Sequence, residues 1–179
     1  GGTTDVATIS LGGIVSSTSI RQAGDKFNQA ITNFVHSKYN LLIGERTAED
    51  IKIQISSASV EAAKEIESKT IRGRDLVSGL PKSLEISAVD VATAIQDVVQ
   101  DIIVAIKETL ELTSPEIAAD VIDHGIVLTG GGALLKNLPE VISDATKVPV
   151  FIAQDPLDCV AIGTGESLKH LDVMRKTSR

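Results

Sequence analysis

Two glycine-rich loops carry the residue types most able to bind an anion. The first reads Gly-Gly-Thr-Thr-Asp at residues 1–5, and the second reads Thr-Gly-Gly-Gly at residues 129–132. Glycine has no Cβ, so backbone N–H groups in such loops can approach a phosphate closely and can adopt positive φ angles. Threonine hydroxyls and a nearby carboxylate can hold a phosphate or a hydrated Mg²⁺. A tight turn is an equally good interpretation of either loop taken alone.

Neither loop matches the common nucleotide-binding motifs. A P-loop needs Gly-Lys-Ser/Thr after its glycines, and neither loop has it. The segments at 130–135 (GGGALL) and 163–168 (GTGESL) both lack the last glycine of the dinucleotide fingerprint. The second segment falls in a predicted helix, where its two glycines favour close packing over contact with a ligand.

Glu49 and Lys52 form a third candidate group, because residues three apart project from one face of a helix. An exposed ion pair is the preferred interpretation of these two if the glycine loops are ignored. The three histidines lie far apart in the sequence without short ligand spacings, which argues against a zinc site. Cys159 has no cysteine nearby and is interpreted as a small buried hydrophobic residue.

Composition narrows the class of protein further. The 179 residues contain 24 acidic and 17 basic side chains, so the net charge is −7. Phosphate contacts need excess lysine and arginine, so nucleic acid is not an expected partner. Aromatic residues make up 2% of the chain, which predicts an aliphatic core. No apolar run reaches the roughly 18 residues of a membrane-spanning helix. A single cysteine excludes an intramolecular disulfide.

The elements after the first loop have clear local signals. Two β-branched runs, 6–11 and 14–20, flank Gly12-Gly13 and predict a β-hairpin. Apolar residues then recur at three- and four-residue spacing from Phe27 to Val35, which predicts an amphipathic helix. Gly24-Asp25 in front of this stripe is expected to provide its turn and N-cap.

The block from residue 39 to residue 86 has a different character. Thr47 and Asp50 resemble a capping box, so a helix is expected to begin there and to bury Ile51, Ile55 and Ala58. The runs 70–77 and 83–86, with Gly-Leu-Pro between them, predict a second hairpin. The changes of period at its two ends make this block the candidate inserted subdomain.

Helices and strands alternate from residue 87 onward. A wide apolar stripe from Val91 to Leu110 predicts one long helix. Ser114-Pro115 is expected to begin a short helix that ends at His124-Gly125. The apolar segment 126–128 predicts a central strand that runs directly into the second glycine loop. The remaining expected elements are a helix over 134–145 interrupted or restarted by Pro139, a buried strand over 148–153, and a final helix over 159–173. Together these predict an α/β fold with a mixed sheet.

Taken in order, five segments resemble the motifs of bacterial actin homologues of the MreB/Mbl type. The family places its second phosphate loop and hairpin first, its adenosine motif late and a C-terminal signature last. The matching segments are GGTTDVA (1–7) with ISLGGIV (9–15), SIRQAGD (19–25), YNLLIGERTAE (39–49), GIVLTGGGALL (125–135) and DPLDCVA (155–161).

This resemblance implies membership of the actin/Hsp70/hexokinase ATPase superfamily. The implied fold is one α/β actin-like (ribonuclease H-like) lobe, with a mixed sheet flanked by helices and a small inserted α+β subdomain. It implies the second lobe (domain II) of a protein that holds ATP between two lobes. The large subdomain (IIA) would comprise residues 1–38 and 87–179, and the small one (IIB) residues 39–86.

The resemblance also implies roles for individual residues. The β- and γ-phosphates would be bound by Gly1, Gly2 and Thr3, and Thr3 and Thr4 are alternative candidates for polarising the attacking water. Glu49 and Lys52 would face the ribose and adenine. The adenosine and α-phosphate side would contact Gly130, Gly131, Gly132 and Ala133. The implied cofactors are ATP or ADP with Mg²⁺, the metal being shared with the first lobe and having no ligand set within this segment.

The implied function is that of an MreB-like cytoskeletal ATPase lobe. The parent protein would polymerise into membrane-associated filaments in the cytoplasm, at the inner face of the cell membrane, and maintain bacterial cell shape. Expected partners are other protomers, the membrane through the first lobe, and cell-shape or cell-wall synthesis proteins. The family's Asp-x-Gly before the first glycines is absent, as are the groups of the first lobe. Phosphoryl transfer needs positioning from several sides, so little or no hydrolysis is expected from this chain alone. The alternatives are a non-catalytic interaction lobe and an Hsp70-like ATPase lobe.

Overall fold

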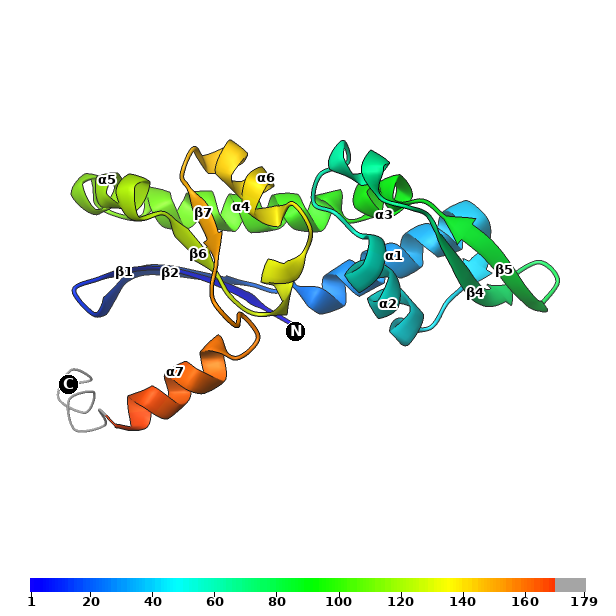
Figure 1. The fold of residues 1–179 in the computed structure, drawn as a ribbon, viewed down its shortest axis with the longest axis horizontal. Helices are drawn as coiled ribbons and strands as arrows, with labels where there is room; N and C mark the ends of the chain where they lie inside the picture. Colours follow the sequence, from blue (N-terminus) through cyan, green and yellow to red (C-terminus); the bar gives the residue numbers. More distant parts are fainter. Residues whose placement is uncertain (170–179) are drawn as a thin grey trace.

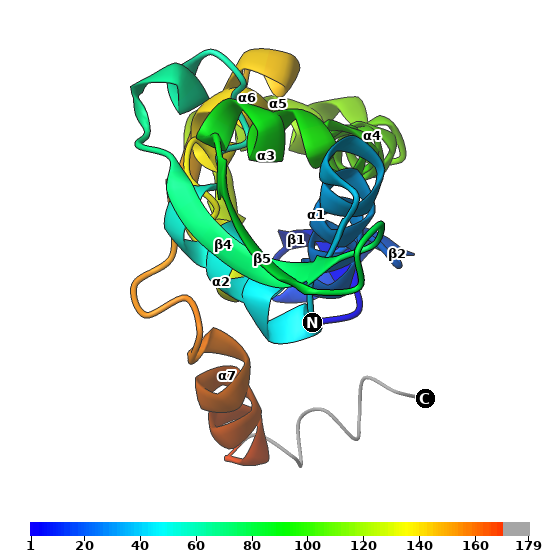
Figure 2. The ribbon, with the colours of Figure 1, turned by 90° about the vertical axis from the view of Figure 1, so that its right-hand side faces the viewer.

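The computed structural model describes residues 1–169, which are arranged along one long axis (Figure 1). A hairpin formed by β1 (Thr4–Ser10) and β2 (Gly13–Ile20) lies at one end of this axis. A second hairpin, formed by β4 (Lys69–Asp75) and β5 (Pro81–Ile86), lies at the other end. Figure 2 looks along the axis from the β4–β5 end, with α3 above that hairpin. Both predicted hairpins are therefore confirmed, and they form the two poles of the molecule.

The strands pair in both orientations. β1 and β2 are antiparallel, and β3 (Leu41–Leu42), β4 and β5 form a three-stranded antiparallel sheet. β6 (Ile126–Leu128) and β7 (Val150–Ile152) are parallel. The α/β class expected from the sequence is present, and among residues 1–169 these pairs form three separate sheets.

Helices connect and cover these sheets. One helix has nearly the predicted bounds. It was expected to begin at Ser114-Pro115 and to end at His124-Gly125, and α5 begins at Pro115 and ends at His124. The helices of the described part are α1 (Gly24–Tyr39), α2 (Glu45–Ile55), α3 (Ala88–Ala94), α4 (Gln96–Glu111), α5 (Pro115–His124), α6 (Leu138–Thr146) and α7 (Cys159–Leu168), with short 3₁₀ helices η1 (Ala62–Glu65) and η2 (Gly131–Leu134).

The core is aliphatic, as the composition predicts, and α1 to α4 supply most of it. Ile31 of α1, Ile51 of α2, Val91 of α3 and Val99 of α4 are each at most 1% exposed. Full burial of such a side chain contributes about 1.5–3 kcal/mol relative to an exposed one. Since α1 and α2 share the core with α3 and α4, α2 is held rigidly against α1.

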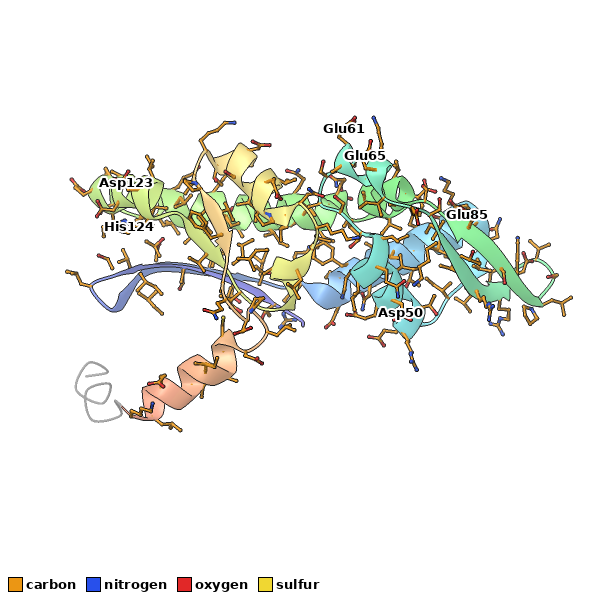
Figure 3. All side chains as sticks on the ribbon, viewed as in Figure 1. Asp50, Glu61, Glu65, Glu85, Asp123 and His124 are labelled. Carbon is orange, nitrogen blue, oxygen red and sulfur yellow. The ribbon has the colours of Figure 1, made fainter. Side chains whose placement is uncertain are left out.

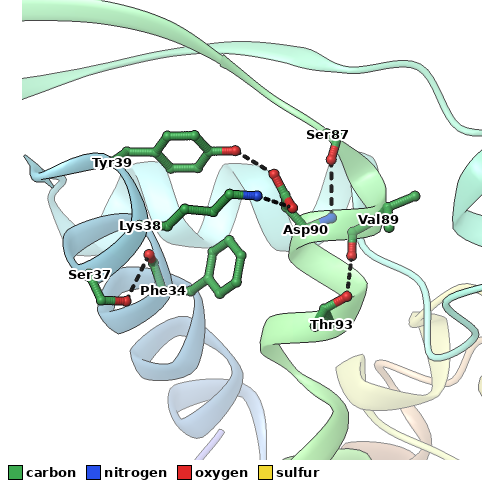
Figure 4. Close-up of polar contacts among 8 residues, drawn as sticks. All are labelled: Phe34, Ser37, Lys38, Tyr39, Ser87, Val89, Asp90 and Thr93. Carbon is green, nitrogen blue, oxygen red and sulfur yellow. Dashed lines mark hydrogen bonds and ion pairs between the residues drawn. The ribbon is translucent and has the colours of Figure 1, made fainter.

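A polar cluster joins the end of α1 to the start of α3 (Figure 4). Lys38 Nζ lies 2.6 Å from Asp90 Oδ1, and the Tyr39 hydroxyl donates a hydrogen bond to Asp90 Oδ2. Ser87 Oγ accepts a hydrogen bond from the Asp90 backbone N–H at 3.1 Å and so caps α3. The cluster connects the two points at which the chain passes into and out of the block 39–86.

Two predicted helix starts are wrong. The N-cap of α1 is Ala23, not Gly24-Asp25, and that of α2 is Gly44, so Thr47 lies within the helix and caps nothing. β3 pairs with β4 through Leu41 and Leu42, so the chain must turn directly afterwards. The helix therefore begins earlier than its local capping signal indicates. The predicted inward residues Ile51, Ile55 and Ala58 are buried.

The single long helix predicted over 91–110 is instead two helices, α3 and α4, separated at Ile95. This residue has φ −96° and ψ 0°, outside the helical range. The Gln96 side chain explains the break, because its Nε2 donates to the carbonyl of Ala92 at 3.0 Å and to that of Ala58 at 3.0 Å. A side chain inserted into the helical hydrogen-bond ladder is a recognised cause of such breaks.

The predictions for the last third of the chain need further correction. β6 was expected to be central and β7 buried, yet Val127 and Phe151 are 59% and 54% exposed, because within residues 1–169 the two strands pair only with each other. The helix predicted over 134–145 is divided into η2 and α6 by Asn137, which has φ +61°. Pro139 lies in the first turn of α6, where proline is tolerated.

α7 is the least covered helix. It begins at Cys159 as predicted and is described to Leu168; residues 170–173 of the expected helix, and His170, lie outside the described residues. Cys159 is only half-buried, which corrects the prediction of a buried residue. Gly163 and Gly165 have no atom within 4 Å of an ideal Cβ, so they permit no close packing within residues 1–169.

Candidate functional site

The helix α2 connects the three predicted site segments. In its last turn, Lys52 Nζ lies 3.4 Å from the carbonyl oxygen of Gly24, and the next residue, Asp25, donates its backbone N–H to the carbonyl of Gly1 at 3.3 Å. The first glycine loop is thereby held beside Lys52. Figure 3 draws all side chains on this arrangement.

The same end of α2, with the residues just after it, holds the segment that follows the second glycine loop. The backbone N–H of Ala58 donates to the Lys136 carbonyl at 2.8 Å, and Lys136 Nζ donates to the Gln54 carbonyl at 2.7 Å. Ser57 Oγ donates to Asn137 Oδ1 at 3.0 Å. Residues 136 and 137 come directly after η2, so α2 is in contact with segments adjoining both glycine loops.

Glu49 and Lys52 form a close pair on α2. Lys52 Nζ lies 2.7 Å from Glu49 Oε2, and the lysine side chain is 17% exposed while the glutamate side chain is 44% exposed. Asn28 of α1 donates its Nδ2 to the same carboxylate oxygen at 2.6 Å. Hydrogen bonds from Lys52 and then from Asn28 lower the pKa of Glu49 below its ordinary value, with burial opposing them. Glu49 is therefore a carboxylate at neutral pH.

Sequence analysis missed Asn28, although a signal for it exists. Asn28, Ile31 and Val35 lie at helical spacing on one face of α1, and all three are buried. A polar residue within an apolar stripe needs a hydrogen-bond partner, since burial without one is costly. The stripe thus indicates a buried polar contact, but only the tertiary structure identifies Glu49 as its partner.

The first loop is open to solvent and its two threonines differ. Gly1, Gly2 and Thr3 are exposed. Thr3 Oγ1 donates to Asp5 Oδ2 at 3.1 Å at the surface, whereas Thr4 Oγ1 donates to the backbone carbonyl of Gln22 at 2.6 Å. The Thr4 hydroxyl proton therefore forms a hydrogen bond that links the start of β1 to the residues after β2. A Cβ on Gly1 would lie 2.8 Å from Asp25 Oδ1, so a side chain here would displace the Asp25 carboxylate.

The second loop turns sharply at a glycine with positive φ. Gly130 has φ +78°, and its N–H donates to the Pro156 carbonyl at 2.7 Å. Within the described part of the chain, no atom lies within 4 Å of an ideal Cβ at Gly130 or Gly132, so no packing contact seen there explains glycine at position 132. Gly131 approaches only Leu157 Cδ2, at 3.5 Å. Ala133 is 3% exposed, so its side chain belongs to the core and only its backbone remains for a ligand.

Other parts of the described chain give less support for a functional site. A hollow of about 540 Å³ between the end of β2 and α4 is lined by residues that include Gln22, Lys26 and Asp101, and by none of the predicted site residues. Among residues 1–169, no three His, Cys, Asp or Glu side chains are grouped so that they could hold a metal ion. None of the helices that the structure describes is both long and apolar enough to cross a membrane.

Solved structures share this fold, and two of them hold nucleotides. MreB5 of Spiroplasma citri bound to ADP superposes with a TM-score of 0.90 at 41% identity, covering 95% of this chain and 51% of that one. The same protein bound to AMPPNP gives a TM-score of 0.88 at 39% identity. A MamK double helical filament, at 22% identity and a TM-score of 0.71, shares the fold.

Curated relatives of known sequence belong to the same group of MreB and Mbl proteins as the MreB5 structures. The cell shape-determining protein Mbl of Bacillus subtilis is 51% identical over 176 residues, which cover 98% of this chain and 52% of that protein. The cell shape-determining protein MreB of Escherichia coli is 45% identical over 174 residues, 97% of this chain and 49% of that protein. The chain thus spans about half the length of the curated relatives it matches. The family model for MreB/Mbl proteins matches residues 1–176, and the chain belongs to the MreB/Mbl family.

Proposed function

We propose that this chain is the nucleotide-binding lobe of an MreB-like cytoskeletal ATPase, corresponding to the second lobe, or domain II. The observation that carries the proposal is the position of α2, whose Glu49–Lys52 pair lies beside the first glycine loop and whose end contacts the segment after the second. Two MreB5 structures bound to ADP and AMPPNP support the same assignment.

The proposed ligand contacts follow from what each group can offer. Gly1 and Gly2 provide exposed backbone N–H groups for the β- and γ-phosphates. The anionic Glu49 accepts hydrogen bonds from sugar or base donors, while Lys52 supplies positive charge beside it. On the adenosine and α-phosphate side, the ligand would contact backbone atoms at Gly130, Gly131, Gly132 and Ala133, where the open space beside Gly132 leaves room for it.

Of the two threonines, Thr3 is the better candidate for polarising the attacking water. Within residues 1–169 its exposed hydroxyl bonds only to Asp5, whereas that of Thr4 donates to the Gln22 carbonyl and is committed to the fold. Mg²⁺ would neutralise phosphate charge. With no metal-binding cluster among residues 1–169, it would be held by the phosphates and by oxygen ligands outside them.

The division into subdomains is part of the proposal. Residues 1–38 and 87–179 would form the large subdomain, and residues 39–86 the small one. This assignment is supported by the separate β3–β4–β5 sheet and by the Lys38–Asp90 contact where the chain passes between them.

Self-association into filaments would be the protein's mechanical function. Both poles present apolar turns: Leu11 and Ile14 are 106% and 70% exposed at one, and Val77 and Leu80 are 86% and 64% exposed at the other (Figure 1). The charges are opposite in sign, since α5 exposes Glu116, Asp120 and Asp123 whereas β4 exposes Arg72 and Arg74. Two different, complementary ends favour head-to-tail contacts, which propagate into open filaments.

The cellular role is proposed from the named relatives. Mbl and MreB are cell shape-determining proteins, so a filament of the parent protein would maintain cell shape together with cell-wall synthesis partners. It would lie in the cytoplasm at the inner face of the membrane, with the first lobe making the membrane contact. This chain alone is expected to hydrolyse ATP weakly or not at all, because it supplies only one side of the phosphate.

ATP binding and phosphate release by this chain, and by the chain joined to a first lobe of its family, test the proposal. The joined protein should bind and hydrolyse ATP, and Gly132→Val should abolish binding because its side chain would fill the proposed ligand space. Gly165→Val is the matched control, since the space beside Gly165 is equally open. If Gly132→Val leaves ATP binding intact, the assigned site is wrong. Filaments that form without nucleotide binding would instead support a non-catalytic interaction lobe.

A further inference from the structure

We infer that Asn28 is a positioning residue that fixes the orientation of the Glu49 carboxylate, so that its second oxygen is presented to a hydroxyl donor of the ligand. The inference rests on the proposed function, because the ligand is the nucleotide of that proposal. Asn28 itself is buried and touches no ligand; it acts through Glu49.

The two donors at Glu49 converge on one oxygen. Asn28 Nδ2 lies 2.6 Å and Lys52 Nζ 2.7 Å from Glu49 Oε2. Among residues 1–169, Oε1 of the same carboxylate receives no hydrogen bond, and the glutamate side chain is 44% exposed. Two bonds to one oxygen prevent free rotation of the carboxylate and leave the other oxygen available as an acceptor.

Within the described structure, the side-chain amide of Asn28 makes one hydrogen bond, the one to Glu49. Asn28 is 6% exposed, and its Oδ1 is buried without a hydrogen-bond partner among residues 1–169. An unpaired buried acceptor destabilises a fold, and an apolar residue of similar shape would avoid that cost. The asparagine is therefore explained by what its Nδ2 does, which is to donate to Glu49.

The ligand group must be a donor. An ionised carboxylate only accepts hydrogen bonds, and the lowered pKa of Glu49 keeps it ionised at neutral pH. Among the parts of an adenine nucleotide, the ribose hydroxyls and the adenine amino group are donors, whereas the phosphates are anionic and would be repelled. We take the ribose as the group that meets Glu49, because it presents two adjacent hydroxyl donors. The Asn28–Glu49 contact is accordingly assigned to discrimination between a ribose and a sugar that lacks a hydroxyl.

The test compares the affinities of ATP and 3′-deoxy-ATP, and of 2′-deoxy-ATP, by calorimetry on this chain and on the chain joined to a first lobe. The variants are Asn28→Leu, which keeps the branched shape with larger end groups, and Asn28→Ala, which cannot overpack. The ratio of the ATP and deoxy-ATP affinities should fall about fivefold in both, the size expected for one orienting hydrogen bond. Gln29→Leu is the matched control, an exposed amide one residue along α1, and it should leave the ratio unchanged.

Two further readouts separate positioning from a merely structural role. Asn28→Leu removes an unpaired buried acceptor together with the bond to Glu49, two opposing effects, so its melting temperature should change little while discrimination falls. Carbon-13 titration of the Glu49 carboxyl, which needs no nucleotide, should show a higher pKa in both Asn28 variants. An unchanged pKa together with an unchanged affinity ratio would overturn the inference. If the unchanged protein binds no ATP, or binds all three nucleotides equally, the proposed function fails instead, and the titration still tests whether Asn28 orients Glu49.

Discussion

Asp90 is the residue through which the end of α1 is held to the start of α3, and its replacement gives a quantitative test. The Asp90 carboxylate forms an ion pair with Lys38 Nζ at 2.6 Å and accepts a hydrogen bond from the Tyr39 hydroxyl. The Asp90 side chain is 19% exposed. Asp90→Asn keeps the shape and removes the charge, and Asp90→Ala removes the acceptor altogether. Both substitutions leave the Ser87 cap intact, because that bond uses the Asp90 backbone N–H.

The expected cost comes mainly from Tyr39. A hydrogen bond to a charged acceptor contributes about 1.5–3 kcal/mol, and the Lys38 pair is given no weight because that lysine is half-exposed. Asp90→Ala should therefore reduce the free energy of unfolding by about 2 kcal/mol. At about 2–4 °C per kcal/mol for a chain of this length, the melting temperature should fall by about 4–8 °C. Asp90→Asn should cost about half as much, since its amide oxygen still accepts from Tyr39.

The effect should depend on pH in one direction. Burial raises the pKa of Asp90, but the hydrogen bonds from Lys38 and Tyr39 outweigh it, so the folded-state pKa lies below the ordinary value. A depressed pKa contributes stability that is present above the unfolded-state pKa, about 3.9, and is lost as pH falls through the folded-state pKa. The difference between the unchanged protein and Asp90→Asn should accordingly be full at pH 6 and should shrink below about pH 4.

Thermal melting followed by circular dichroism at pH 6 and pH 3 measures both quantities. Glu61→Gln is the control, because the Glu61–Lys64 pair is exposed on both sides and should contribute less than about 0.5 kcal/mol. The reasoning is refuted if Asp90→Ala melts within 1 °C of the unchanged chain at pH 6. It is also refuted if the Asp90→Asn difference does not decrease in acid.

Three further predictions concern other parts of the molecule. Gly73→Ala should lower the melting temperature by about 4–8 °C, an overpacking cost of about 2 kcal/mol, because the added Cβ would lie 2.9 Å from Leu41 Cγ; Gly44→Ala, in open space, should not. Asp75→Asn should flatten the loss of stability in acid, since hydrogen bonds from Lys82 and Ser78 hold the pKa of Asp75 below its ordinary value; unfolding curves between pH 6 and pH 2 check this. Val77→Asp in the protein joined to its first lobe should raise the concentration at which ATP-dependent filaments sediment, whereas Ile53→Asp, an exposed apolar residue of α2 away from the poles, should not.

Short-range signals account for the parts of the fold that sequence analysis predicted well. The β1–β2 turn follows from Gly12, which has φ +77°, and the hairpin between β4 and β5 follows from a turn containing Gly79 at φ +73°. The start of α5 follows from Pro115. Each of these features depends on residues within a few positions of one another, so the local sequence is sufficient to predict them.

Longer-range contacts explain the predictions that failed. The break at Ile95 depends on Gln96 reaching the carbonyl of Ala58, a residue 38 positions away. The early start of α2 depends on the pairing of β3 with β4, whose strands are separated by the whole helix. The exposure of β6 and β7 depends on how many strands lie beside them, which an apolar run does not specify.

The sequence by itself determined the α/β class, the glycine loops and the Glu49–Lys52 pair, because these are properties of residue type and short spacing, and the family was indicated by the resemblance of five ordered motifs. The tertiary structure decided which groups meet and which remain free. The Thr4 hydroxyl donates to a carbonyl 18 positions away in the sequence, while the Thr3 hydroxyl lies at the surface. Asn28 donates to Glu49, which is 21 positions away. A hydrogen bond depends on where its two partners lie in space, and only the packing of α1 against α2 and of β1 beside β2 brings these partners together.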